Sequence, residues 1–253
     1  MKADFMNRSQ LKLIPIVLLT VMQVLGSAGV GRSGIQSEGT QPKSHILLLD
    51  ELDENERSGF TIEELIPVLE NSSGDTLRYV IKEISSMGES AKPAIPYLIP
   101  LLKNPDPSIR SSVVGVLAVL EESAIIPILI PLLKDPDSEV RWQTALYLGY
   151  LVKSSKLIIP EIIPLLQDSD ASVRSFAVFS VGLFGEASIP KLRPLLKDPN
   201  SIVRLRVAEA FGTMDTAAAA VATIPDLIPL LHDPDKRVRS AAAEALKKLG
   251  YKP

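Results

Sequence analysis

The chain of 253 residues contains no cysteine and only two histidines, and aromatic residues make up 5% of it. The absence of cysteine excludes disulfides, thiolate metal sites, a cysteine nucleophile and lipid attachment at an N-terminal cysteine, and it suits an oxidising compartment. A catalytic triad would have to use His45 or His232, and no glycine-rich phosphate loop occurs. The net charge of -3 lacks the basic excess typical of nucleic-acid binding. These absences argue against an enzyme and against a nucleic-acid partner.

A long hydrophobic run is also missing. The apolar stretch over residues 13–25 is shorter than the roughly 20 residues that a membrane span requires. Lys2, Arg8 and Lys12 precede it, and small residues follow at 26–29. This order predicts a signal peptide over residues 1–28, and hence export to the periplasm or the cell exterior, with no stable membrane span in the mature form. An uncleaved N-terminal membrane anchor is the alternative.

Residues 29–60 are predicted to be a linker. Its first part is rich in Gly, Ser and Gln, which favours a flexible chain. Residues 46–49 and Leu52 are apolar, and we expect the segment 46–52 to form a short helix that caps the open end of the array that follows.

The most informative feature present is a phrase of the type Ile-Pro-x-Leu-Ile-Pro-Leu-Leu, which occurs six times. Its second proline falls at Pro67, Pro100, Pro131, Pro164, Pro194 and Pro229, in steps of 33, 31, 33, 30 and 35 residues. A recurring step of this length is typical of stacked supersecondary units, each of which buries its apolar side against its neighbours. The sequence therefore predicts a repeat array over residues 61–253.

Each repeat is predicted to be a pair of antiparallel helices. The first helix starts at the Ile-Pro pair and bends at the second proline, and a turn with an Asp or Asn N-cap leads into the second. The second helix carries an arginine at a fixed place, and aliphatic or small residues follow at offsets +3, +4, +7 and +10 from it. At offset +8 the residue is small, which predicts close approach of neighbouring helices: Ala118, Gly149, Gly182 and Gly212. The predicted fold class is all-α, an α-solenoid of about six two-helix repeats.

The string Leu-Leu-His-Asp-Pro-Asp-Lys-Arg-Val-Arg-Ser-Ala-Ala-Ala-Glu-Ala-Leu at residues 230–246 resembles the HEAT repeat, and more narrowly its phycobilisome-lyase HEAT-like variant. The resemblance covers residues 62–251. Proteins of this kind include scaffolds, bilin lyase subunits and deoxyhypusine hydroxylases. The hydroxylases bind iron through His-Glu dipeptides, whereas here Ile46 and Asp233 follow the two histidines. We therefore expect no metal site and no cofactor.

The turn aspartates and helix arginines, such as Asp106 with Arg110, could suggest a polar site. Because the same pair recurs from repeat to repeat, we interpret it as structural: the aspartate caps the helix, and the arginine bonds carboxylates and carbonyls of neighbouring turns.

Offsets +1, +2, +5 and +9 of the second helix are expected to face away from the core, on the concave side. In the third and fourth repeats they hold an aromatic and aliphatic cluster, and the fifth adds a charged rim. The candidate partner-binding residues are Trp142, Leu146, Tyr150, Phe176, Phe179, Leu183, Arg206 and Glu209. An exposed cluster of this kind marks a binding surface, which predicts a non-enzymatic scaffold for a protein or peptide segment.

Alternatives remain open. Residues 46–52 could fold onto these rings, or the offsets could be one residue out, which would place the rings in the core. A bilin-lyase-like accessory protein would use Trp142, Tyr150 and Phe179 to shelter a small conjugated ligand. A purely structural spacer would have no partner.

Overall fold

A computed structural model describes residues 60–120, 123–151, 158–214 and 216–252. The predicted signal peptide and all of the predicted linker except Phe60 lie outside the described residues. Residues 60–253 form one compact unit. Every regular element in the described ranges is an α-helix or a 3-10 helix. The predicted all-α solenoid is therefore confirmed.

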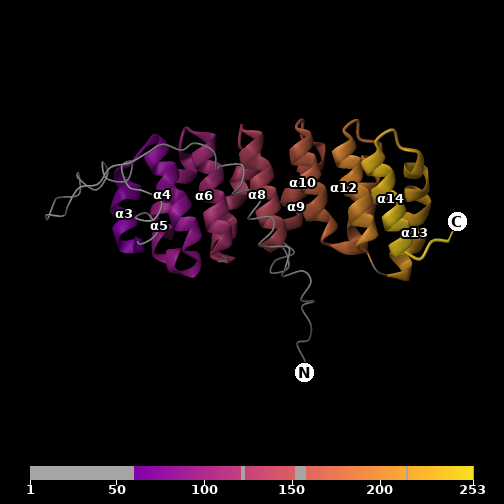
Figure 1. The fold of residues 1–253 in the computed structure, drawn as a ribbon, viewed down its shortest axis with the longest axis horizontal. Coiled ribbons are helices and arrows are strands. Elements are labelled where there is room, and N and C mark those ends of the chain that lie inside the picture. The colour runs from indigo at the N-terminus through magenta and orange to yellow at the C-terminus, as the bar shows by residue number, and fades with distance from the viewer. Residues whose placement is uncertain (1–59, 121–122, 152–157, 215, 253) are drawn as a thin grey trace, which may run out of the picture. The chain divides into compact units, whose positions relative to one another are not determined.

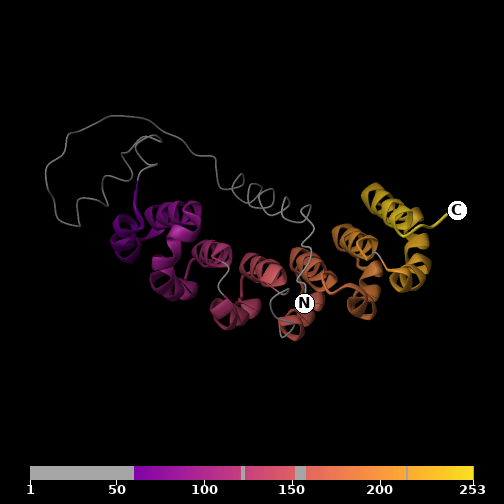
Figure 2. The same ribbon diagram turned by 90° about the horizontal axis from the view of Figure 1, so that it is seen from below.

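The helices form two rows, which are seen end-on in Figure 2 and labelled in Figure 1. The outer row holds the first helix of each repeat: α3 (Ile62–Asn71), α5 (Ile95–Leu98) with η3 (Ile99–Lys103), α7 (Ile126–Leu129) with η5 (Ile130–Lys134), α9 (Ile159–Ile162) with η8 (Ile163–Gln167), α11 (Ile189–Leu192) with η10 (Arg193–Lys197), and α13 (Ala217–Leu227) with η11 (Ile228–His232). The inner row holds the second helices: α4 (Gly74–Ser86), α6 (Pro107–Val119), α8 (Ser138–Leu151), α10 (Ala171–Gly182), α12 (Ser201–Gly212) and α14 (Lys236–Lys248). Short 3-10 segments η2 (Gly88–Ala94), η4 (Ser123–Ile125) and η9 (Gly185–Ser188) lead into first helices.

The second proline of the repeat phrase changes the helix type. Pro100 is the second residue of η3, and the α-helix before it ends at Leu98. The same change occurs at Pro131, Pro164 and Pro194. Proline removes an i→i−4 hydrogen bond and crowds the preceding turn, so the chain continues in the tighter 3-10 form. The first repeat differs, because α3 holds Pro67 within one continuous α-helix.

The predicted N-caps are present at the start of the second helices. The Asp106 side chain accepts a hydrogen bond from the Ser108 backbone N–H at 2.9 Å, and the Asp170 side chain accepts one from Ser172 N–H at 2.7 Å. Asn200 caps α12 in the same way. Each cap satisfies a backbone donor that the first helical turn leaves unpaired, and so fixes where the helix begins.

Neighbouring inner helices pack directly against one another, from α4 and α6 through to α12 and α14. The small residue at offset +8 is the point of closest approach. A Cβ atom added at Gly149 would lie 2.6 Å from Ser180 Cβ and 3.0 Å from Ser180 Cα, and one at Gly212 would lie 2.8 Å from Ala245 Cα. These distances are too short for real carbon contacts, so the prediction of close approach at offset +8 is confirmed.

The arginines form a ladder along the turns, as the sequence predicted. Arg110 donates two hydrogen bonds to Asp135, from Nε at 2.9 Å and Nη2 at 2.7 Å, and a third from Nη1 to the Asn104 carbonyl at 2.8 Å. The carboxylate is thus the first aspartate of the next turn, while the second Asp or Asn of that turn is the N-cap. Three further rungs repeat this geometry: Arg141 with Asp168, Arg174 with Asp198 and Arg204 with Asp233.

The rungs are charged pairs with little exposure to solvent. Burial by itself raises the pKa of Asp135, but hydrogen bonds from Arg110 and the Asp137 backbone N–H outweigh it, so this pKa lies below its ordinary value. The first rung differs because Asn104 stands where the others have aspartate. Arg78 instead bonds Asp106 at 2.7 Å and also its own helix's Asp75.

Candidate functional site

Two pairs of aromatic rings join α8 and α10 in the middle of the array. Trp142 and Phe176 are stacked with ring centroids 4.4 Å apart, and Tyr150 and Phe179 meet edge to face at 5.5 Å. All four side chains are half-buried. They form what we call the central aromatic surface. The structure therefore brings together four of the predicted site residues, in pairs that span two repeats.

Glu139 is a member of this site that sequence reasoning missed. Its carboxylate accepts hydrogen bonds from Trp142 Nε1 at 2.9 Å and from Gln143 Nε2 at 2.8 Å. Because the indole N–H is thereby satisfied, the Trp142 ring is held in one orientation and presents an apolar surface. The spacing of three residues between Glu139 and Trp142 on one helix was the available signal.

Leu146 does not lie where we predicted. It was expected to face away from the core, but only 3% of its surface is exposed. Gln143 and Ser175, at the outward offsets +2 and +1, are buried as well. The reason is that α8 and α10 each have an inner helix on both sides, and this widens the buried arc beyond the stripe that a helix packed on one side shows.

The remaining predicted residues lie at the edges of the central aromatic surface. Arg206 and Glu209 on α12 pair with each other at 2.8 Å, and both are substantially exposed. Burial raises the pKa of Tyr150, and the nearby positive charge of Arg206 partly opposes that shift. Leu183 is the half-buried C-cap of α10. The charged rim is therefore close to Tyr150 and its two charges neutralise each other.

The four rings are not fully buried, which bears on the alternative that they belong to the core. If the offsets were one residue out, the rings would be core residues, whereas all four remain partly exposed. The other alternative, occupation by residues 46–52, lies outside the described residues.

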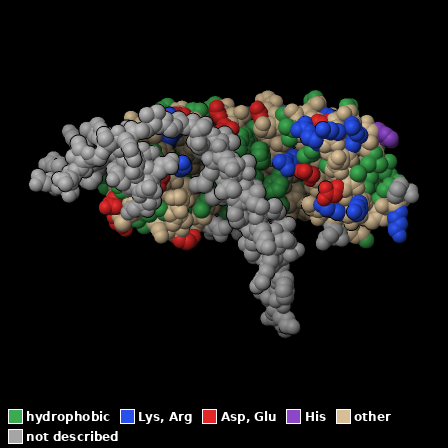
Figure 3. Space-filling view, viewed as in Figure 1, with side chains coloured by type: hydrophobic (Ala, Val, Ile, Leu, Met, Phe, Trp, Pro, Cys, Tyr) green, Lys and Arg blue, Asp and Glu red, His purple; other side chains and the backbone are tan. Residues whose placement is uncertain are grey.

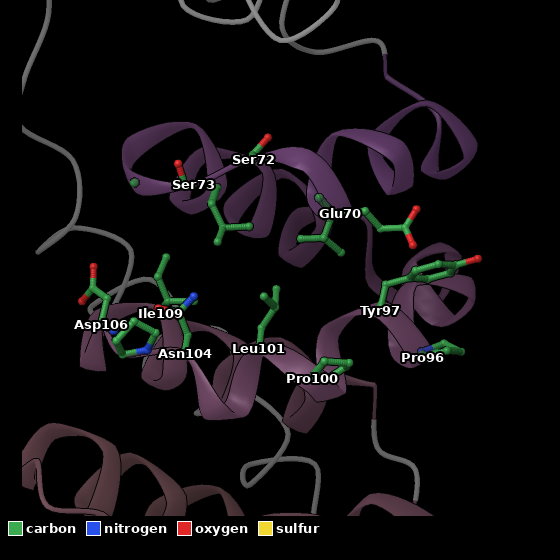
Figure 4. A pocket seen from close by; sticks show the side chains of 14 residues that line it. Glu70, Ser72, Ser73, Pro96, Tyr97, Pro100, Leu101, Asn104, Asp106 and Ile109 are labelled. Atoms are coloured by element: carbon green, nitrogen blue, oxygen red, sulfur yellow. Dashed lines mark hydrogen bonds between the residues drawn. The ribbon is translucent and has the colours of Figure 1, made fainter. Parts of the chain in front are cut away.

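A cavity of about 620 Å³ lies between the first two repeats, and sequence reasoning did not single it out. In Figure 4, Glu70 and Tyr97 lie at one end of it, and Ser73, Asn104 and Asp106 lie at the other. Its lining includes Pro96, Pro100 and Leu101 of the repeat phrase and the turn residues 104–106. The corresponding residues of other repeats form the first helix and the turn that follows it.

The described ranges contain no group of three or more His, Asp or Glu side chains that could hold a metal ion. They also contain no helix with the length and apolar character needed to cross a membrane. The half-buried rings of the central aromatic surface are suited to stacking on apolar or aromatic groups.

The sequence matches the family described as HEAT repeats over residues 62–149 and 159–247. Among curated proteins, no sequence matches the chain. Several solved structures share its fold. The Escherichia coli protein YibA is 19% identical, with 84% of this chain and 77% of that one aligned and a TM-score of 0.59.

Two further solved structures are similar at the level of the fold. A designed armadillo repeat protein in complex with the peptide (KR)4 is 17% identical over 74% of this chain and 99% of its own, with a TM-score of 0.56. The complex of CpcE and CpcF of phycocyanin lyase from Nostoc sp. PCC7120 is 22% identical over 76% of this chain and 78% of the other, with a TM-score of 0.55.

Proposed function

The chain belongs to the HEAT repeat family, and from that premise we propose that it is a non-enzymatic scaffold that binds a protein or peptide segment on its central aromatic surface. The observation that carries this proposal is the pair of ring contacts between α8 and α10, both half-exposed in the middle of the inner row. Solvent contact with rings of this size is unfavourable, and partner binding removes it.

The contrast with the neighbouring repeats supports this location. At the offsets that hold rings in the third and fourth repeats, the last two hold Leu205, Arg206, Glu209 and Thr213, then Ser240, Ala241, Glu244 and Lys248. The fifth repeat is stacked between two neighbours as the third and fourth are, so packing alone does not call for aromatic residues at these places. A partner that binds at the third and fourth repeats accounts better for aromatic residues at these places.

The structural neighbours support the kind of partner. One is a repeat protein solved with a bound peptide, and another is a complex of two protein chains. For this chain we accordingly propose a polypeptide that lies across α8 and α10, with apolar side chains against the rings and polar groups near Arg206 and Glu209. We also propose, from residues 1–28, that the protein is exported. N-terminal sequencing of the natural protein tests this, since a mature chain that starts near residue 29 is expected.

The binding proposal can be tested with the full chain and a library of random peptides. Trp142 is the only tryptophan, so its fluorescence reports directly on the site. Peptides selected on the wild-type protein should change this emission on binding. Phe179→Ala should weaken their affinity by about thirtyfold, which is the size of an aromatic hot spot of about 2 kcal/mol.

Tyr97→Ala is the matched control, because Tyr97 is an exposed aromatic residue on the outer helix α5 and should not affect binding. Phe179→Ala removes one ring pair and the burial of a half-buried ring, which should lower the free energy of unfolding by about 2 kcal/mol. Selected peptides that bind Phe179→Ala as tightly as the wild type would contradict the proposal. A visible absorbance band in the protein purified from its natural host would instead favour the alternative, an accessory protein that shelters a conjugated ligand.

A further inference from the structure

One side of α14 is exposed, whereas its counterparts in the interior repeats are buried or half-buried. Lys236, Arg239, Ala243 and Lys247 are spaced three or four residues apart, so they share one face of the helix, and all four are exposed. We call this the α14 basic face. It lies two repeats beyond the central aromatic surface and does not overlap with it. In Figure 3, basic side chains gather over this end of the array.

The equivalent positions in the interior repeats show what this face does elsewhere. In place of Ala243 they have Val114, Ala145, Val178 and Ala208, each with 0% exposure. In place of Lys247 they have the small residues that approach the next helix. At the position of Lys236 no interior repeat has a cation. The last repeat therefore retains the arginine of the ladder but exchanges a close-packing face for a row of positive charges.

Arg239 is oriented like the arginines that bind aspartate. Its Nη1 donates to the carbonyls of Asp233 and Pro234 at 2.7 and 2.9 Å, just as Arg204 Nη1 donates to those of Asp198 and Pro199. In Arg204 the other edge, Nε and Nη2, binds Asp233 at 2.7 and 2.9 Å. That edge of Arg239 has no carboxylate partner among the described residues.

The other positive charges of α14 are already paired. Arg237 pairs with Asp235 and Lys248 with Glu244, within the helix and its N-cap. In the described ranges Lys236, Arg239 and Lys247 form no ion pair. The unpaired cations are thus the ones on the α14 basic face, which makes this face distinct from an ordinary charged helix surface.

We propose that the α14 basic face binds an acidic polypeptide segment, with an aspartate carboxylate held by Nε and Nη2 of Arg239 and a second carboxylate at Lys247. Arg239 and Lys247 are eight residues apart, which is about 12 Å along the helix. An extended peptide rises about 3.3 Å per residue and places residues i and i+4 on the same side. The ligand is therefore an extended segment with acidic residues about four positions apart.

Three other occupants fit less well. A further stacked repeat would need a small residue at offset +8, and Lys247 prevents the approach seen at Gly212. In each turn whose carboxylate is held by the preceding arginine, the aspartate stands six residues before the arginine of its own repeat. A second copy that stacked its first repeat on α14 would have Ser72 at that position, six residues before Arg78, and so would offer Arg239 no carboxylate there. A nucleic acid shares the negative charge, but the four interior rungs show that this arginine geometry accepts carboxylates.

The test is fluorescence anisotropy with the full chain and a labelled decapeptide of alanine, serine and two aspartates four positions apart. The same peptide with asparagine in place of aspartate is the control ligand. Arg239→Ala should weaken binding of the aspartate peptide by about tenfold or more at low ionic strength, the size expected for a bidentate charge-assisted contact. Lys247→Ala, which breaks no bond within the fold, should weaken it by a smaller factor. Raising the salt concentration should weaken it further.

Arg237→Ala and Lys248→Ala are matched controls, because both remove one positive charge from α14 but lie off the basic face. They should change the affinity by about twofold or less, as expected for screened charges at this distance. Equal losses for Arg237→Ala and Arg239→Ala would overturn the proposal in favour of unspecific attraction. It is also overturned if the aspartate and asparagine peptides bind alike, or if a single-stranded oligonucleotide binds more tightly than the aspartate peptide.

Discussion

Arg141 shows how one side chain links two repeats. Its Nη1 bonds the carbonyls of Asp135 and Pro136 in its own turn, and Nε and Nη2 bond Asp168 in the next. The planar guanidinium suits this arrangement because its donors point in fixed directions within one plane. Lysine would carry the same charge without the fork. The arginine thus fixes the distance between consecutive turns as well as the direction of stacking.

The two aspartates of the fourth turn should respond differently to the same substitution. Asp168→Asn should lower the free energy of unfolding by about 3 kcal/mol, because it leaves the Arg141 charge without its carboxylate partner in a place with little solvent. Asp170→Asn should change it little, because asparagine caps helices about as well as aspartate, as Asn200 does at α12. Urea denaturation of the two variants measures the difference. If both variants lost the same free energy of unfolding, the ion pair of Asp168 with Arg141 would contribute no more to stability than the N-cap at Asp170.

At the scale of the element, the two helices of a repeat differ in what surrounds them. The outer helices of the interior repeats are interrupted by proline and continue as 3-10 turns, whereas the inner helices have no internal proline and lie between two neighbours. An inner helix is consequently buried on opposite sides and exposed only along a narrow strip. The central aromatic surface occupies such a strip on α8 and α10, so rigid helices on both sides hold its rings in place.

Two glycines of inner helices should respond in opposite ways to alanine. Gly149→Ala should lower the free energy of unfolding by about 1 to 2 kcal/mol, because the new methyl group would meet the Ser180 backbone and only part of that overpacking is offset by better helix propensity. Gly115→Ala should be neutral or slightly stabilising. Its methyl group would meet only the end of the Tyr147 side chain, with the hydroxyl 3.3 Å away, and alanine has the better helix propensity. Thermal unfolding of both variants is the measurement, and a stabilised Gly149→Ala would contradict the close approach of α8 and α10.

At the scale of the whole array, contacts join each repeat to its neighbours, so stability should be local. Gly212→Val would force α12 and α14 apart, because even a Cβ atom would lie 2.7 Å from Ala245 Cβ. In hydrogen exchange, amides of α13 and α14 should then lose protection while those of α4 to α8 retain theirs. The same loss of protection in all repeats would show a cooperative unit in place of a nearest-neighbour stack.

Most of the fold could be predicted from the sequence because its determinants are local. Helix starts follow from the capping residues, the change of helix type follows from the second proline, and the step of the repeat follows from counting. The resemblance to HEAT repeats and the close approach at offset +8 were also confirmed, because both follow from the pattern that recurs in each repeat. The site was predicted less completely: four rings were placed on one surface, but Leu146 was wrongly expected to be exposed and Glu139 was missed.

What the sequence by itself determined is the repeating pair of helices, since spacing along one chain specifies which residues share a side of a helix. The tertiary structure alone decided how neighbouring helices are offset, and with that offset which aspartate meets Arg141, which ring stacks on Trp142, and how wide an arc of α8 is buried. These relations join residues about 30 positions apart. A shift of a single residue between two helices would change all of them while leaving each helix's own pattern intact.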